Sequence, residues 1–197
     1  MRVRTDEKKH EILHAAGELF RELGLTGVSM TAIASHLGIS KATLYGYFSS
    51  KEELFAEAMV FIVRDRGEEM LSTLNSDEDS RLVLNRFARA YLPFATQPDI
   101  IAHARVAIGD GPRSELGPML YRLGQRRSLV ALENYLARAT AAGMLDCPDV
   151  AIAAQHLKGM LEAGTVIPML YGTSPQYPFD TLADAAVEAF IKIYGKS

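Results

Sequence analysis

Apolar residues recur at helical spacing near the start of the chain. They fall three and four positions apart, as on one face of an amphipathic helix. The set is Ile12, Leu13, Ala16, Leu19, Phe20 and Leu23. Residues 24–27 read Gly-Leu-Thr-Gly and predict the end of this helix. Ser29 then predicts the start of a second helix, because its hydroxyl oxygen can accept a hydrogen bond from a free backbone amide.

A third helix follows after a short turn. The second helix carries a small apolar face and ends at Gly38, since glycine readily takes the left-handed conformation that closes a helix. Ile39 fills the corner, and Ser40 caps the third helix. Leu44 and Phe48 lie four residues apart and face inward. This pattern of two short helices around a tight turn predicts a helix-turn-helix.

Helical periodicity continues to the end of the chain, while alternating strand patterns are poor. Residues 49–53 contain two overlapping Ser-x-x-Glu capping boxes, so a fourth helix is predicted to start there. A polar acidic loop spans residues 75–80. Further helices are predicted over residues 82–93, 98–108, 119–142, 149–171 and 181–194. The predicted fold class is all-α.

Composition narrows the picture further. The chain has 197 residues and a net charge of −3, with a single cysteine, Cys147. One cysteine excludes an internal disulfide, so we expect a reducing, cytoplasmic location. No signal peptide and no apolar stretch long enough for a membrane span are recognisable. Residues 1–51 carry seven Lys/Arg and five Asp/Glu, a net of +2, which leaves −5 for the remainder. A basic tip on an acidic body favours oriented docking onto DNA over general coating of nucleic acid.

The third helix presents residues suited to DNA. Its outward set is Lys41, Ala42, Thr43, Tyr45, Gly46 and Tyr47. Small side chains allow close approach, and Thr43 offers a hydroxyl for a phosphate or base edge and a methyl for thymine. The second helix of a helix-turn-helix lies in the major groove with its N-terminal residues on base edges. We expect the two tyrosines and Lys51 to contact phosphates, which position a protein without reading sequence.

The run from Gly38 to Leu54 resembles the signature of the TetR family of bacterial transcriptional regulators, and the match covers about residues 6–62. The resemblance implies a three-helix DNA-binding domain, placed at residues 1–50, and a helical ligand-binding and dimerisation domain at residues 51–197. Carried over by position, the expected DNA contacts are Thr31, Lys41, Ala42, Thr43, Tyr45, Gly46, Tyr47 and Lys51. The position of Gly46 often carries a larger residue in the family, so the base preference is harder to infer here.

The C-terminal half resembles the AefR-like subgroup of the family over residues 142–157. Two long apolar helices, about 119–142 and 149–171, bury more apolar face than one small domain needs. They are predicted to form the interface of a homodimer as a four-helix bundle. The alternative is that these faces close the core of a monomer.

An apolar pocket for a small-molecule effector is implied by the family rather than by residue spacing. The candidate residues are Phe55, Met59, Ile62, Phe87, Tyr91, Phe94, His103, Tyr121 and Met169. Tyr91, His103 and Tyr121 are the candidate polar anchors, since ligand pockets are mostly apolar with a few polar groups. The alternative for each residue is ordinary core packing.

The sequence contains no recognisable set of catalytic residues. Phosphate-binding loops and nucleophile elbows are missing, and the histidines are scattered. His10 and His14 share a helical face but have no cysteine nearby, so no metal site and no cofactor are expected. The predicted function is therefore a non-enzymatic repressor, released from a palindromic operator by a small apolar or amphipathic ligand. The alternatives are a helical scaffold protein with a vestigial helix-turn-helix and an enzyme built on a helical bundle.

Overall fold

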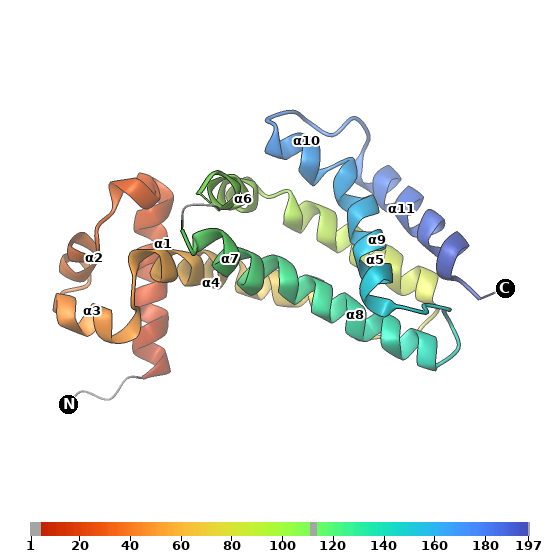
Figure 1. The fold of residues 1–197 in the computed structure, drawn as a ribbon, viewed down its shortest axis with the longest axis horizontal. Coiled ribbons are helices and arrows are strands. Elements are labelled where there is room, and N and C mark those ends of the chain that lie inside the picture. The colour runs from red at the N-terminus through yellow and green to blue at the C-terminus, as the bar shows by residue number, and fades with distance from the viewer. Residues whose placement is uncertain (1–4, 111–113, 197) are drawn as a thin grey trace. The chain divides into compact units, whose positions relative to one another are not determined.

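A computed structural model describes residues 5–110 and 114–196 of the chain (Figure 1). Apart from an isolated bridge between Leu145 and Gly195, all regular structure in these residues is helical, which confirms the all-α prediction. The helices are α1 (Asp6–Gly27), α2 (Met30–His36), α3 (Lys41–Tyr47), α4 (Lys51–Ser72), α5 (Ser80–Ala95), α6 (Pro98–Asp110), α7 (Leu116–Leu120), the π-helical turn η1 (Tyr121–Gln125), α8 (Arg126–Ala141), α9 (Val150–Ala163), α10 (Val166–Leu170) and α11 (Phe179–Tyr194). In the described part of the chain, no helix combines the length and apolar character needed to cross a membrane.

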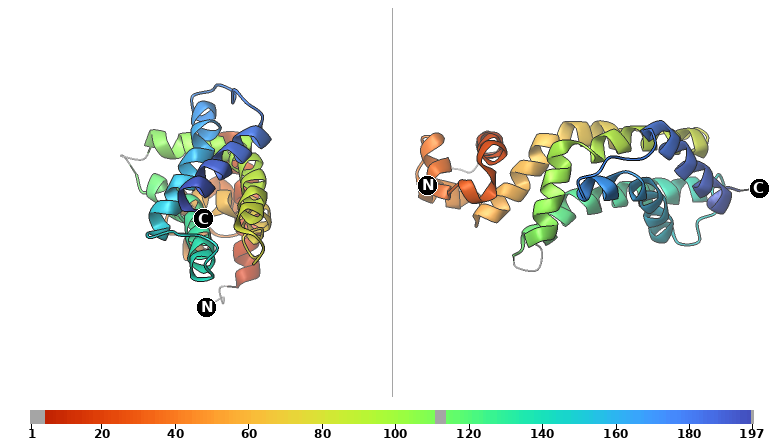
Figure 2. Two further views of the ribbon diagram at one scale, coloured as in Figure 1. Left: turned by 90° about the vertical axis from the view of Figure 1, so that its right-hand side faces the viewer. Right: turned by 90° about the horizontal axis from the view of Figure 1, so that it is seen from above.

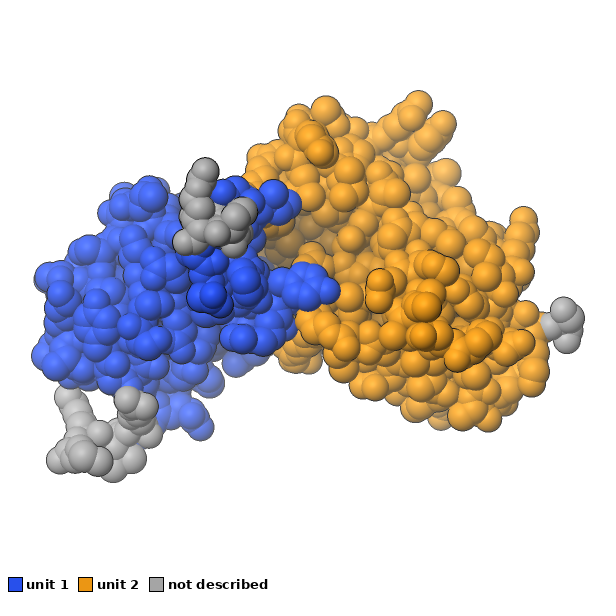
Figure 3. All heavy atoms as spheres, viewed as in Figure 1, with its two compact units in different colours: residues 1–64, 107–124 blue, residues 65–106, 125–197 orange. Residues whose placement is uncertain are grey.

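The helices pack as two compact units, coloured separately in Figure 3. Unit 1 contains residues up to Arg64 and the later segment 107–124. Unit 2 contains residues 65–106 and the remainder from Gln125. The sequence motif suggested a division after residue 50. Packing groups the chain differently, because α4 contributes side chains to both cores and α7 contributes to the first.

The core of unit 1 holds the helix-turn-helix in place. Ile12 of α1, Ile33 of α2 and Leu44 of α3 are fully buried together. Phe20 and Phe55 pack edge to face, with ring centroids 5.0 Å apart, and so join α1 to α4. The apolar stripe predicted on the first helix is therefore the face that holds α1 against its neighbours.

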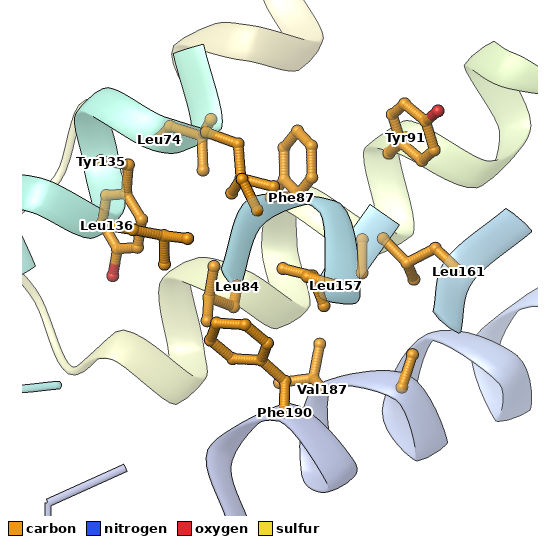
Figure 4. Close-up of a cluster of buried hydrophobic side chains, with 14 of the residues drawn as sticks. Leu74, Leu84, Phe87, Tyr91, Tyr135, Leu136, Leu157, Leu161, Val187 and Phe190 are labelled. Atoms are coloured by element: carbon orange, nitrogen blue, oxygen red, sulfur yellow. The ribbon is translucent and has the colours of Figure 1, made fainter. Parts of the chain in front are cut away.

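Unit 2 is a helical bundle with its own core (Figure 4). Within it, α11 packs against α5 and α9, and α8 packs against α9, as Figures 1 and 2 also show. Phe87 and Tyr91 of α5 stack with ring centroids 5.5 Å apart. Leu157 of α9 and Phe190 of α11 are both fully buried in the same cluster.

Two predicted helices differ from the structure. The helix expected over residues 149–171 breaks at Gly164 and Thr165, and α10 resumes at Val166. Pro168 accounts for the break, because in a continuous helix its ring would clash with the carbonyl of the residue four positions earlier, Gly164. The helix expected over residues 119–142 begins earlier, at Leu116, and is interrupted by the π-helical turn η1.

Candidate nucleic-acid interface

Local chemistry fixes the corner between α2 and α3. The Ser29 hydroxyl accepts from the amide of Ala32 at 3.1 Å, and the Ser40 hydroxyl accepts from the amide of Thr43 at 3.0 Å. Both predicted N-caps are thereby confirmed. Gly38 has a φ of +62°, in the left-handed region that glycine adopts without steric cost. Phe48, fully buried, fixes the end of α3.

The outward face of α3 carries the residues expected at a DNA groove. Lys41 and Ala42 are exposed, and Tyr45 is 45% exposed. The Lys41 ammonium lies 5.8 Å from the centroid of the Tyr45 ring, within the range of a cation–π contact. Gly46 is half-buried beside them. A cation and a phenol are thus presented together to solvent from one face of α3.

Two of the expected contact residues already have partners inside unit 1. The Thr43 hydroxyl lies 2.8 Å from the Ser40 hydroxyl, so a contact with DNA would have to share or replace this hydrogen bond. The Tyr47 hydroxyl accepts from the amide of Thr5 at 3.4 Å, at the N-cap of α1. Tyr47 therefore supports the start of α1 as well as flanking the recognition face.

Lys51 is placed differently from expectation. Its ammonium donates to the carbonyl oxygens of Leu25 at 2.8 Å and Val28 at 3.2 Å. These carbonyls lie at the end of α1 and in the loop that follows it, so Lys51 closes the corner between α1 and α2. A role for Lys51 as a phosphate contact stays a prediction, and the structure adds a structural role.

Replacing Lys51 with alanine is expected to lower the free energy of unfolding by about 1–2 kcal/mol, because two charge-assisted hydrogen bonds to half-buried carbonyls are lost. Urea unfolding followed by circular dichroism measures this change. Lys41→Ala is the matched control, since Lys41 is exposed and its removal should change stability by no more than about 0.5 kcal/mol. Equal stability of the Lys51→Ala variant and the unsubstituted protein would contradict the structural role.

A surface depression of about 480 Å³ lies beside the recognition face. Its lining includes four of the expected DNA contacts, namely Thr31, Lys41, Tyr45 and Lys51. The rest of the lining comes from residues 26–30 and Ala32. The described lining thus contains two lysines and no carboxylate, a charge pattern that suits a phosphate group. The other four expected contacts, Ala42, Thr43, Gly46 and Tyr47, lie outside it.

The candidate ligand-pocket residues fall into both units. Phe55 and Met59 are buried in the core of unit 1, and Ile62 packs against that core. The Ile62 side chain packs against Gly17 of α1 and occupies the space that a side chain at Gly17 would need. Tyr121, also in unit 1, is largely exposed. Packing within unit 1 accounts for Phe55, Met59 and Ile62, so the candidate ligand site does not include them.

The remaining candidates belong to unit 2. Phe87 and Tyr91 are buried in its core, and Phe94 and Met169 are partly buried against it. His103 of α6 is half-buried, and burial lowers its pKa, although the nearby Asp99 acts in the opposite direction. The candidate ligand site is therefore restricted to these five residues of unit 2.

Residue spacing does not indicate the polar partners of Tyr91. Its hydroxyl donates to Glu162 of α9, and Glu162 also accepts from Lys158 one turn earlier. The available signal was a lysine and a glutamate four residues apart in the otherwise apolar segment 150–163. Among residues 5–110 and 114–196, no group of three or more His, Cys, Asp or Glu side chains is arranged to hold a metal ion.

Comparison with known proteins gives two family matches. Residues 12–58 match the family described as bacterial regulatory proteins of the tetR family. Residues 82–196, more than half of the chain, match the C-terminal domain of AefR-like transcriptional repressors. Both resemblances inferred from the sequence are thereby confirmed.

Individual relatives are also transcriptional regulators. The chain is 29% identical over 160 residues to the HTH-type transcriptional activator FasR of Mycolicibacterium smegmatis, covering 73% of this chain and 70% of FasR. A solved TetR-family regulator from Mesorhizobium loti is 29% identical with a TM-score of 0.83, covering 99% of this chain and all of the other. The flavonoid-responsive regulator FrrA is 28% identical with a TM-score of 0.75, covering 96% and 98%. The chain therefore belongs to the TetR family of bacterial transcriptional regulators, which are non-enzymatic DNA-binding proteins.

Proposed function

We propose that this regulator is a repressor that binds a palindromic operator as a homodimer and is released by a small apolar or amphipathic molecule. The observation that carries the proposal is the solvent-facing row on α3, in which Ala42 is exposed and Lys41 and Tyr45 line a depression that also includes Lys51. An intact recognition face of this kind argues against a scaffold protein with a vestigial motif. Because its target is chromosomal DNA, we expect the protein to act in the cytoplasm.

The choice between repression and activation rests on the C-terminal half of the chain. Its family description is that of a repressor, and the match covers residues 82–196. The relative FasR is named an activator, which makes activation the second candidate. Repression is favoured because the family match covers the described helices of unit 2 from α5 onward. A reporter assay with the operator placed over a promoter separates the two candidates.

The proposed dimer interface combines α9, α10 and α11. Exposed apolar and small residues run along one side of the α9–α10 segment, and a second row, in which Leu182 and Ala189 are half-buried and the other two residues exposed, follows α11. The two rows are Ile152, Gly159, Ala163 and Ile167, and Leu182, Ala185, Ala189 and Ile193. The helices pack directly against each other, with the Leu182 side chain 3.2 Å from an ideal Cβ on Gly164. Paired with a second copy, the two rows would make a four-helix arrangement.

This assignment revises the pair of helices predicted from the sequence. The segment 149–171 is retained as α9 and α10, but the exposed side chains favour α11 over the helix predicted at 119–142. The outward face of α8 carries Arg126, Arg127 and Arg138, with Val130 as its exposed large apolar residue. Charged residues are depleted at the centre of protein interfaces, so this face suits solvent better.

A selected-DNA experiment tests the proposal. Duplexes bound by the full chain are recovered from a random pool at two salt concentrations. The expected product is a palindrome with half-sites one helical turn apart, roughly 34–36 Å, whose affinity falls steeply with salt. A small-molecule panel is then screened for release of this operator, beginning with flavonoids because of the likeness to FrrA. Failure to enrich any sequence, with or without added ligand, would return the scaffold alternative to first place.

Substitutions on α3 are expected to separate base reading from phosphate contact. Lys41→Ala should relax base preference at one operator position, by about 1–3 kcal/mol of discrimination. Tyr45→Phe should instead weaken binding to all sequences alike, by about 0.5–1.5 kcal/mol, the value of one hydrogen bond. Competition binding against a set of single-base operator variants measures both effects. If Lys41→Ala weakens every sequence equally, the lysine contacts phosphate and its proposed base contact is wrong.

A further inference from the structure

A buried polar cluster joins three segments of unit 2. Lys158 and Glu162 come from α9, Tyr91 comes from α5, and Gln125 is the last residue of η1. The Lys158 ammonium donates to Gln125 Oε1 at 2.5 Å and also to Glu162 Oε1. The same glutamate oxygen also accepts a hydrogen bond from the Tyr91 hydroxyl. We call these four residues the α9 polar cluster.

The cluster is unusually buried for groups of this kind. Lys158 is only 9% exposed, and Tyr91 is fully within the core. Desolvation raises the pKa of Tyr91 well above its usual value, and the Glu162 carboxylate raises it further, so the phenol keeps its proton. A buried ion pair contributes little net stability, because the cost of desolvating two charges offsets their attraction. Stability alone therefore does not account for placing this pair inside the bundle.

The π-helical turn is a second and independent observation. It spans Tyr121–Gln125 within an otherwise α-helical stretch, and its last residue is the one that reaches Lys158. Single π-turns inside α-helices are rare and occur frequently at functional sites. Gln125, the residue at which the turn ends, belongs to unit 2 and contacts the ion pair there.

Aromatic side chains of α5 lead to the cluster. Phe87, Tyr91 and Phe94 lie four and three residues apart, on one side of the helix. Phe87 stacks on Tyr91, and Phe94 is only partly buried. Figure 4 shows the Tyr91 hydroxyl pointing away from Phe87, at the edge of the buried hydrophobic side chains. The cluster therefore joins this aromatic row through the Tyr91 hydroxyl.

We infer that the α9 polar cluster is the polar anchor of the effector site and that it selects an uncharged aromatic molecule carrying a hydroxyl group. The inference rests on the proposed function, because it names the ligand class of the site through which release would occur. Lys158 and Glu162 carry opposite charges and leave the cluster neutral. A hydroxyl both donates and accepts, so it can accept from the lysine and donate to the glutamate. A carboxylate or an ammonium would leave one buried charge without a counter-charge.

Three matched probes test the ligand class on the full-length protein. They are 2-naphthol, 2-naphthoate and naphthalene, which share one ring system and differ in the polar group. Equilibrium dialysis at neutral pH gives their dissociation constants. We expect 2-naphthol to bind at least about tenfold more tightly than the other two, the value of one to two hydrogen bonds. Equal or tighter binding of 2-naphthoate would overturn the ligand class, and so would equal binding of naphthalene.

Substitutions test whether the α9 polar cluster is where the hydroxyl group binds. Lys158→Met together with Glu162→Gln removes both charges at once, and Tyr91→Phe removes the hydroxyl. Each change is expected to abolish the tenfold preference for 2-naphthol over naphthalene, with folding verified by circular dichroism. Asp184→Asn is the control, because Asp184 forms an exposed ion pair with Arg89 in the same unit and should leave 2-naphthol binding unchanged. An undiminished preference in the Lys158→Met/Glu162→Gln variant would overturn the site.

Operator binding measured in the same samples separates this inference from the proposed function. If 2-naphthol binds as expected without lowering operator affinity, the anchor is supported and release by ligand is wrong. If some other ligand releases the operator equally from the unsubstituted protein and the Lys158→Met/Glu162→Gln variant, release by ligand is supported and the anchor is wrong.

Discussion

Aspartate at both Ile152 and Ile193 is expected to convert the protein to a monomer and to weaken operator binding by about 10²–10⁴-fold. The two side chains are 49% and 58% exposed in the single chain and lie on the proposed interface helices α9 and α11. Aspartate there would bury charges without partners in the dimer. The operator then loses its second half-site contact, and with it the gain from effective concentration.

Light scattering during size-exclusion chromatography gives the oligomeric state, and fluorescence anisotropy with labelled operator gives the affinity. Val130→Asp on α8 is the matched control, because Val130 is 38% exposed on the face rich in arginine. This variant should remain dimeric. A monomeric Val130→Asp protein would instead support the interface predicted from the sequence, with residues 119–142 at its centre.

Glutamine in place of Glu162 is expected to lower the free energy of unfolding by about 3 kcal/mol, whereas the Lys158→Met/Glu162→Gln double variant should stay within about 1 kcal/mol of the unsubstituted protein. The single change leaves the Lys158 ammonium, with a side chain only 11% exposed, without its counter-charge. The double change removes the charge that would otherwise be stranded. The single variant is thus expected to lose more stability than the double variant, even though the double carries more substitutions.

Urea unfolding at one fixed protein concentration measures these values, since a dimer's stability depends on concentration. Equal urea dependence (m-values) for the three proteins shows that the denatured states are comparable. A double variant as unstable as the single one would mean that Lys158 and Glu162 stabilise the fold by packing and hydrogen bonding rather than by neutralising each other.

The DNA-binding unit was predictable because its determinants are local. Ser29 and Ser40 cap helices through amides only three residues away, and Gly38 supplies the left-handed turn at its own position. Such short-range chemistry is readable in sequence without knowledge of the rest of the fold. The same holds for the apolar stripe on the first helix, whose spacing alone gives the buried face.

Partners distant in sequence were not predictable in the same way. Lys51 is visible as a lysine, but the carbonyls of Leu25 and Val28 become its acceptors only when α4 docks beside the first corner. Lys158 and Glu162 are a readable pair on one helix, yet their burial depends on Tyr91, more than sixty residues earlier. Long polar side chains have too many rotamers for spacing to determine where they end.

The breaks in the C-terminal helices were partly predictable, because one of them has a local signal in the sequence and the other has none. Pro168 was available in the sequence and explains why α9 stops before Thr165. Apolar periodicity continued through the break and concealed it. The π-helical turn has no comparable local signal, since Tyr121–Gln125 contains ordinary helix formers together with one glycine. The choice of interface helices followed from exposure, which periodicity alone does not reveal.

Leu116 limits the exchange of the helix-turn-helix segment, residues 5–64, between proteins by recombination. Its side chain is completely buried in unit 1, although it follows the first segment of that unit by a long stretch of sequence. Recombination that joined residues 5–64 to a foreign body would leave a hole there unless the new body supplied a matching apolar side chain. Residues 5–64 are therefore not an independently exchangeable domain. New operator preferences are reached more directly by point substitution on α3.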